Sequence, residues 1–177
     1  MFKLPVEKLS ALFAAVAGKE ALYIPADDAS GQARYQRWHE GMEMTHALNT
    51  VRSAKDFFFP QTENLVDFKV KGKEIEIIDP RTEHEDFVIF GVRACDARSF
   101  TVLDKVFLDP VDSYYKSRRE HGTIVTLACT HPEETCFCSV FGIDPAQPEG
   151  DARCWMDEKN LYIEAVTEKG EAFVASV

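Results

Sequence analysis

Four cysteines carry the most distinctive chemistry in this sequence: Cys95, Cys129, Cys136 and Cys138, all between residues 87 and 145 of a 177-residue chain. Three of them share the ten-residue stretch Cys-Thr-His-Pro-Glu-Glu-Thr-Cys-Phe-Cys. Thiolates are soft ligands for zinc and for iron–sulfur clusters, and three thiols this close together do not suit a disulfide framework. We therefore expect one soft-metal site with these four ligands, most simply a [4Fe–4S] cluster, with zinc as the alternative.

Three other side chains near this stretch have competing interpretations. Cys154 falls at a strand position, where a lone cysteine is commonly a small buried hydrophobe, so we exclude it from the site. His131 is an alternative to Cys95 as the fourth ligand, but its place in a loop before Pro132 favours an exposed histidine. Asp96 is interpreted as the N-cap of the helix that follows, rather than as an oxygen ligand.

The composition is that of a globular, acidic chain. Hydrophobic residues make up 45% and charged residues 28%, with a formal net charge of −10. This charge repels phosphate backbones and anionic lipids, so we expect no nucleic-acid partner. No apolar run approaches the roughly 20 residues that span a bilayer, so we expect no membrane span. Residues 1–18 are interpreted as an amphipathic helix and not as a signal peptide, which predicts a cytoplasmic protein with reduced thiols.

Two apolar runs precede the cysteines and predict neighbouring strands of one sheet. Phe87–Val92 and Thr123–Ala128 are separated by segments with helical periodicity, Ser99–Leu108 and Asp112–His121. A strand, a helical crossover and a second strand make a βαβ unit, in which the two strands are parallel.

The four cysteines should meet where these two strands end, because ligands of open parallel sheets bind outside the carboxyl ends of the strands. Cys95 follows the first strand and Cys129 ends the second. The loop 130–135 is short enough to fold back and bring Cys136 and Cys138 to the same place. A regular strand would point the two thiols of Cys-x-Cys to the same face but not at one centre, so we expect irregular backbone there.

Neighbouring residues predict how such a site would be tuned. Arg93 and Arg98 flank Cys95 and would offset the negative charge of a thiolate-ligated cluster. Phe137 and Phe141 would keep water away from it. The Arg118-Arg119 pair is interpreted as a solvated helix face, with a partner-docking patch as the alternative.

The remaining segments predict an α/β fold: a mixed sheet with a central parallel βαβ unit, an N-terminal helix and a C-terminal antiparallel meander. Three consecutive phenylalanines in residues 55–60 are interpreted as a core plug, with a cofactor wall as the alternative. The further strands are expected at Glu20–Pro25, Gln32–Trp38, Leu65–Val70, Lys73–Ile78, Ala152–Met156, Leu161–Thr167 and Glu171–Val177, with a hairpin turn at Lys71-Gly72 and an ambiguous segment at Met42–Ser53.

Several of these residues together resemble a known family. The stretch Gly91-Val-Arg-Ala-Cys-Asp-Ala-Arg98, the pair Tyr114-Tyr115 with Arg118-Arg119-Glu120, and Cys129 with Cys136-Phe-Cys138 are similar to the amino-terminal domain of sulfhydrogenase beta subunits and of the corresponding iron–sulfur subunits of anaerobic sulfite reductases. Residues 55–63 also match this group, so the resemblance covers roughly residues 50–145.

The resemblance implies an iron–sulfur electron-transfer subunit that passes electrons between a flavin-containing subunit and a catalytic subunit. It implies Cys95, Cys129, Cys136 and Cys138 as the cluster ligands. Residues 1–177 would form one cluster-binding domain, the amino-terminal part of a longer subunit, because the family continues into a ferredoxin-like domain. We find no nucleophile–base pair or glycine-rich phosphate loop, so no independent catalytic site is expected. The alternative is a non-redox assembly module that is stabilised by zinc.

Overall fold

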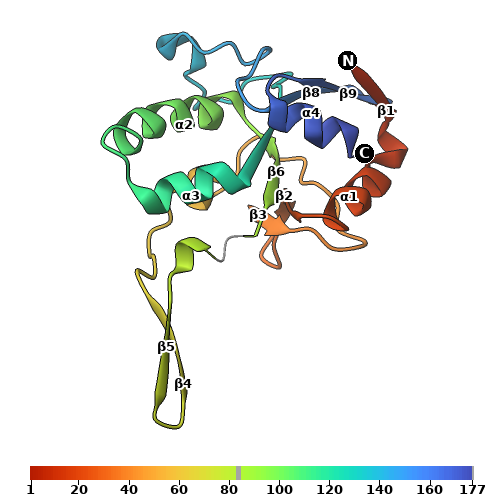
Figure 1. Ribbon diagram of the computed structural model, residues 1–177. Helices are drawn as coiled ribbons and strands as arrows, with labels where there is room; N and C mark the ends of the chain where they lie inside the picture. Colours follow the sequence, from red (N-terminus) through yellow and green to blue (C-terminus); the bar gives the residue numbers. More distant parts are fainter. Residues whose placement is uncertain (83–84, 177) are drawn as a thin grey trace.

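A mixed sheet covered by helices on both faces forms the body of the protein, seen in a computed structural model that describes residues 1–82 and 85–176 (Figure 1). The strands of this sheet are β1 (Phe2–Pro5), β2 (Ala21–Asp27), β3 (Ala33–Arg37), β6 (Phe87–Val92), β7 (Gly122–Leu127), β8 (Ala152–Met156) and β9 (Asn160–Ala165). Their spatial order is β1-β9-β8-β7-β6-β2-β3. The α/β class predicted from the sequence is confirmed.

The centre of the sheet is parallel. β2 pairs with β6, β6 with β7 and β7 with β8, all in parallel. In the central pair Val88 lies opposite Thr123 and Phe90 opposite Val125. Both strands are mostly buried, as apolar runs covered on two faces should be. The predicted βαβ unit is therefore confirmed, and β8 adds one more parallel strand beside it.

The helices cover the two faces of this sheet in pairs. α2 (Ala94–Phe107) and α3 (Ser113–His121) form the crossover on one face, while α1 (Leu9–Ala17) and α4 (Glu168–Ala175) lie on the other (Figure 1). Each pair encloses a core: Leu12, Phe13, Val16 and Phe173 belong to one cluster, and Phe58, Ala97, Phe100 and Tyr115 to the other. Removal of these apolar side chains from water is the main force that holds the layers together.

The C-terminal segment corrects one prediction. Residues 168–175 form helix α4 and not the strand expected at Glu171–Val177, the last residue of which lies outside the described residues. Thr167 caps this helix, because its side chain accepts a hydrogen bond from the Gly170 N–H. Gly170 belongs to the first turn of this helix. The other two strands of the predicted meander, β8 and β9, do pair antiparallel.

A separate antiparallel hairpin, β4 (Asp67–Lys71) with β5 (Glu74–Ile78), projects away from the body (Figure 1). The predicted hairpin is confirmed, with its turn at Gly72-Lys73, one residue later than expected. Gly72 has φ +66°, the left-handed value that the first position of a type II′ turn requires.

The three consecutive phenylalanines mainly fill the core. They overlap the short helix η2 (Ala54–Phe57) and the residues directly after it. Phe58 is fully buried, and its ring lies 5.7 Å from that of Phe87 and 5.0 Å from that of Phe100. Phe59 is 50% exposed at the end of the stretch. The core-plug interpretation is confirmed for Phe58.

The arginine pair on α3 holds the interior together, so its interpretation as a solvated face is wrong. The guanidinium of Arg119 donates two hydrogen bonds to Asp104, at 3.0 and 2.9 Å, and lies over the ring of Phe58. Arg118 donates to the Phe58 carbonyl at 3.0 Å. The sequence periodicity of α3 could not predict these contacts, because Asp104 and the Phe58 carbonyl lie in other parts of the chain.

Candidate metal centre

Cys95 and Cys129 lie where the neighbouring strands β6 and β7 end. A bulge shifts the register of β6 at Gly91, which has φ +82°, and the chain then turns into α2, whose second residue is Cys95. Cys129 comes two residues after the end of β7, and its N–H donates to the Pro145 carbonyl at 3.0 Å. The structure thus places both thiols at the carboxyl end of the parallel strands, as expected.

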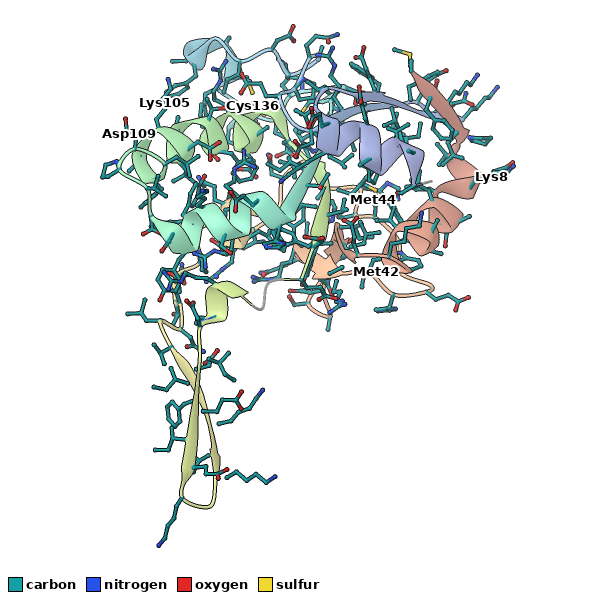
Figure 2. The ribbon with its side chains drawn as sticks, in the orientation of Figure 1. Lys8, Met42, Met44, Lys105, Asp109 and Cys136 are labelled. Atoms are coloured by element: carbon teal, nitrogen blue, oxygen red, sulfur yellow. The ribbon has the colours of Figure 1, made fainter. Side chains whose placement is uncertain are left out.

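The Cys136-Phe-Cys138 segment is irregular, as the sequence predicts, and leads into the short helix η4 (Cys138–Phe141). The Glu133 N–H donates to Cys136 Sγ at 3.3 Å, and the Cys136 N–H donates to the Glu133 carbonyl at 3.0 Å. An amide that donates to sulfur stabilises a thiolate and tunes a cluster bound to it. Figure 2 shows Cys136 on the end of the body that is remote from the hairpin.

Two cavities bring the four cysteines together. One, of about 310 Å³, is lined by Cys95, Cys136 and Cys138. The other, of about 350 Å³, is lined by Cys129, Cys136 and Cys138. Because two cysteines line both cavities, the four thiols surround adjoining spaces at one end of the sheet.

The electrostatics of the thiols agree with this arrangement. Burial raises the pKa of Cys95, and the negative charges of Asp96 and Cys138 raise it further. Burial also raises the pKa of Cys129, where the positive charge of Arg93 acts in the opposite direction and Cys138 again raises the pKa. Arg93 is therefore a cation that favours the thiolate form of Cys129.

The two arginines expected to offset cluster charge have different roles. Arg93 lines the first of these cavities together with Cys95 and donates from Nε to the Leu48 carbonyl at 2.9 Å. Arg98 instead forms an ion pair with Glu149, with 3.1 Å between nitrogen and oxygen. Arg93 therefore fits the expected role, whereas the charge of Arg98 is balanced by a carboxylate.

Asp96 is not the N-cap of α2, which is a correction to the sequence interpretation. The helix begins at Ala94, earlier than expected, so Asp96 lies in its first turn. Its carboxylate accepts a hydrogen bond from Ser53 Oγ at 2.7 Å and a longer one from the Ala54 N–H at 3.4 Å. Asp96 thus fixes the helix that bears Cys95 to the start of η2.

Sequence reasoning missed the segment that covers the site, residues 42–53. Leu48 is buried there and holds Arg93, while Asn49 Nδ2 donates to the Glu133 carboxylate at 3.1 Å in the cysteine loop. Tyr35 also lines the cavity, and burial raises the pKa of its phenol. The segment has no period and no motif, so the only available signal was its lack of regular structure.

Three other predictions around the site have different outcomes. Cys154 is completely buried in the core, as predicted for a small hydrophobe. His131 is exposed, as predicted, with Thr130 Oγ1 at 3.1 Å from its Nδ1. Phe137 lines the first of these cavities and is 56% exposed, and Phe141 is 65% exposed, so the expectation that they keep water from the site stays a prediction.

The donor set fits an iron–sulfur cluster in its chemistry, since it consists of four thiols from three parts of the chain. Within residues 1–82 and 85–176, no three His, Cys, Asp or Glu side chains lie close enough together to hold one metal ion. A zinc ion requires its four sulfurs at about 2.3 Å, whereas a cluster gives each thiolate an iron of its own and spreads the ligands more widely.

Comparison with known proteins relates the chain to a class of redox subunits. It is 33% identical over 126 residues to a hydrogenase subunit, and the match covers 71% of this chain. That relative is Sulfhydrogenase 2 subunit beta from Pyrococcus furiosus, and the matched part is 36% of its length. The identity supports a relationship to that family. No protein-family profile and no solved structure matches the chain.

No helix in the described part of the chain has the length and apolar character needed to cross a membrane.

Proposed function

We propose that this chain is an electron-transfer domain of a multi-subunit redox complex and holds one [4Fe–4S] cluster through Cys95, Cys129, Cys136 and Cys138. The observation that supports the proposal is that these four thiols line two cavities that share Cys136 and Cys138. The similarity to a sulfhydrogenase beta subunit supports the redox role. The proposed partners are a flavin-containing subunit and a catalytic subunit of the same complex in the cytoplasm. The catalytic subunit would carry out the hydrogenase or sulfite reductase reaction.

The chain's own residues would determine how such a site behaves. A bound cluster supplies one-electron transfer, and the protein supplies its ligands and surroundings. Arg93 places a positive charge beside Cys129, and the Glu133 amide donates to Cys136 Sγ. Residues 42–53 cover the cavity that Cys95 lines, while Cys136 is exposed to solvent. The buried side would stabilise the cluster, and the exposed side would let electrons reach a partner.

The metal content of anaerobically purified protein tests this proposal. We expect a brown protein with about four irons per chain and a broad absorption near about 400 nm that bleaches on reduction. A colourless protein with stoichiometric zinc and no iron would instead support the assembly module. Protein purified in air does not decide the matter, so reconstitution with iron and sulfide under anaerobic conditions is part of the measurement.

Arg93→Gln should lower the reduction potential of the cluster. Removal of the cation disfavours the reduced, more negative state, and we expect a shift on the order of 60 mV, equivalent to about 1.4 kcal/mol for one electron. A potentiometric titration followed by absorption measures it. Arg98→Gln is the matched control, since Glu149 already balances that charge. Equal shifts in both variants would contradict the assigned role of Arg93.

A further inference from the structure

The β4–β5 hairpin has one apolar face that the rest of the described chain, residues 1–82 and 85–176, does not cover. The register places Phe68 opposite Ile77 and Val70 opposite Ile75, so these four side chains share a face. They are 68%, 74%, 60% and 67% exposed in that order. The intervening pairs, Lys69 with Glu76 and Lys71 with Glu74, lie on the other face and are charged.

The base of the hairpin is fixed to α3 on both sides. Tyr114 Oη donates to the Leu65 carbonyl at 2.7 Å, just before β4. After β5, in the short helix η3 (Pro80–Thr82), the Arg81 carbonyl accepts a hydrogen bond from Ser117 Oγ at 3.0 Å. The Arg81 guanidinium also lies over the Tyr114 ring, 4.9 Å from its centre. The chain therefore holds the hairpin in a defined direction, as a presented element and not as a loose loop.

An amphipathic hairpin of this kind needs a partner. An isolated two-stranded hairpin is marginal in water, and its apolar face gains stability when another surface covers it. The four side chains expose an area on the order of 500 Å², comparable with the largest apolar patch of a whole monomer. From these observations we propose that the hairpin is a docking arm for another protein subunit, received in an apolar groove with an acidic rim.

Buried area and charge favour another protein subunit over a second copy of this chain or a membrane as the surface that covers the hairpin. Two copies of the face packed flat together would bury only about 1,000 Å² in total, less than the roughly 1,200–2,000 Å² of a stable interface, whereas a groove that also encloses the edges and tip of the hairpin would bury more, so a second copy is a poor occupant. At the tip of the hairpin, Lys71 at the end of β4 and Lys73 in the turn outnumber Glu74, which suits an acidic rim. A membrane is a poor occupant because the chain carries a net charge of −10. The hairpin also lies away from Cys136, so docking leaves the cysteines accessible (Figures 1 and 2).

A matched pair of double variants tests the arm in cells of the native source, where the intact complex assembles. Phe68→Ser with Ile77→Ser should lower the fraction of tagged chain that elutes with other subunits by about tenfold. Lys69→Ser with Glu76→Ser, the adjacent pair on the charged face, should change it by less than about twofold. Equal effects of the two double variants, or none, would overturn the proposal.

Photo-crosslinking identifies what covers the face. A benzoylphenylalanine at position 68 should join the chain to an apolar segment of one co-eluting subunit, and the same group at position 69 should not. Crosslinking to a second copy of this chain, or co-sedimentation of the purified chain with phosphatidylserine vesicles, would overturn the proposal. The inference rests on the proposed function only in expecting another subunit. Iron content separates the two: Cys136→Ser should lose iron and keep the crosslink, and the apolar double variant should keep its iron.

Discussion

Cys136→Ser should abolish cluster binding: iron falls from about four per chain to near zero, and the absorption near about 400 nm is lost. The serine oxygen is a harder and less readily ionised ligand than a thiolate, so it is a poor substitute for sulfur on iron. Cys136 is exposed, so the exchange leaves the apolar cores untouched. Iron analysis and absorption spectra of the anaerobically reconstituted variant, beside a thermal melt, measure the result.

The matched control is Cys154→Ala, a change at the cysteine that is buried in the core. It should retain the full iron content and the spectrum, and lower the free energy of unfolding by about 1 kcal/mol because a small cavity replaces the sulfur. Loss of iron in Cys154→Ala with retention in Cys95→Ala would show that the proposed ligand set is wrong. Cys136→Ser should therefore lose iron and leave the cores intact, whereas Cys154→Ala should keep iron and lose stability.

Gly170→Ala should lower the free energy of unfolding by at least about 4 kcal/mol, enough to prevent folding at ordinary growth temperatures. A Cβ at this position would lie 1.9 Å from the Asp151 carbonyl oxygen and 2.6 Å from its carbon. Both are backbone atoms next to β8, so α4 would have to move away from the sheet and uncover Phe173. Urea denaturation followed by circular dichroism measures the loss.

Gly18→Ala is the control for this glycine, because it makes the same chemical change at the end of α1. Its Cβ would meet the Ala14 carbonyl oxygen at 3.4 Å, an ordinary contact, and its φ of −73° suits any residue. We expect a stabilisation of about 0.5 kcal/mol from the reduced entropy of the unfolded chain. If Gly18→Ala and Gly170→Ala had similar effects, the close approach of α4 to β8 would not be what requires glycine.

Much of the fold follows from short-range pattern. The apolar runs at Phe87–Val92 and Thr123–Ala128 predict strands that are buried on both faces, since such strands are apolar at nearly every position. The segments between them predict the helical crossover, since a helix buried on one face has apolar residues about every three or four positions. The prediction failed at Glu171–Val177. That segment is too short for its period to decide between helix and strand, and a contact with Asp151, distant in sequence, fixes the place of Gly170 in a helix.

The sequence by itself predicts the donor set and the end of the sheet where its thiols should gather. The spacing of the cysteines names the thiols, and the parallel strands bring Cys95 and Cys129 to one end of the sheet, because strand direction alone decides which ends meet. The sequence likewise predicts the hairpin turn from its glycine, although in the structure the turn lies one residue later than predicted.

Only the tertiary structure decided what surrounds these elements. It selected Arg93 over Arg98 as the cation of the site, laid the aperiodic residues 42–53 over the cavity, and left the apolar face of the hairpin uncovered. Each of these depends on contacts between residues far apart in the chain, such as Arg93 with Leu48 or Tyr114 with Leu65. Periodicity carries no information about such contacts, because it records only whether a face is apolar and not what that face meets.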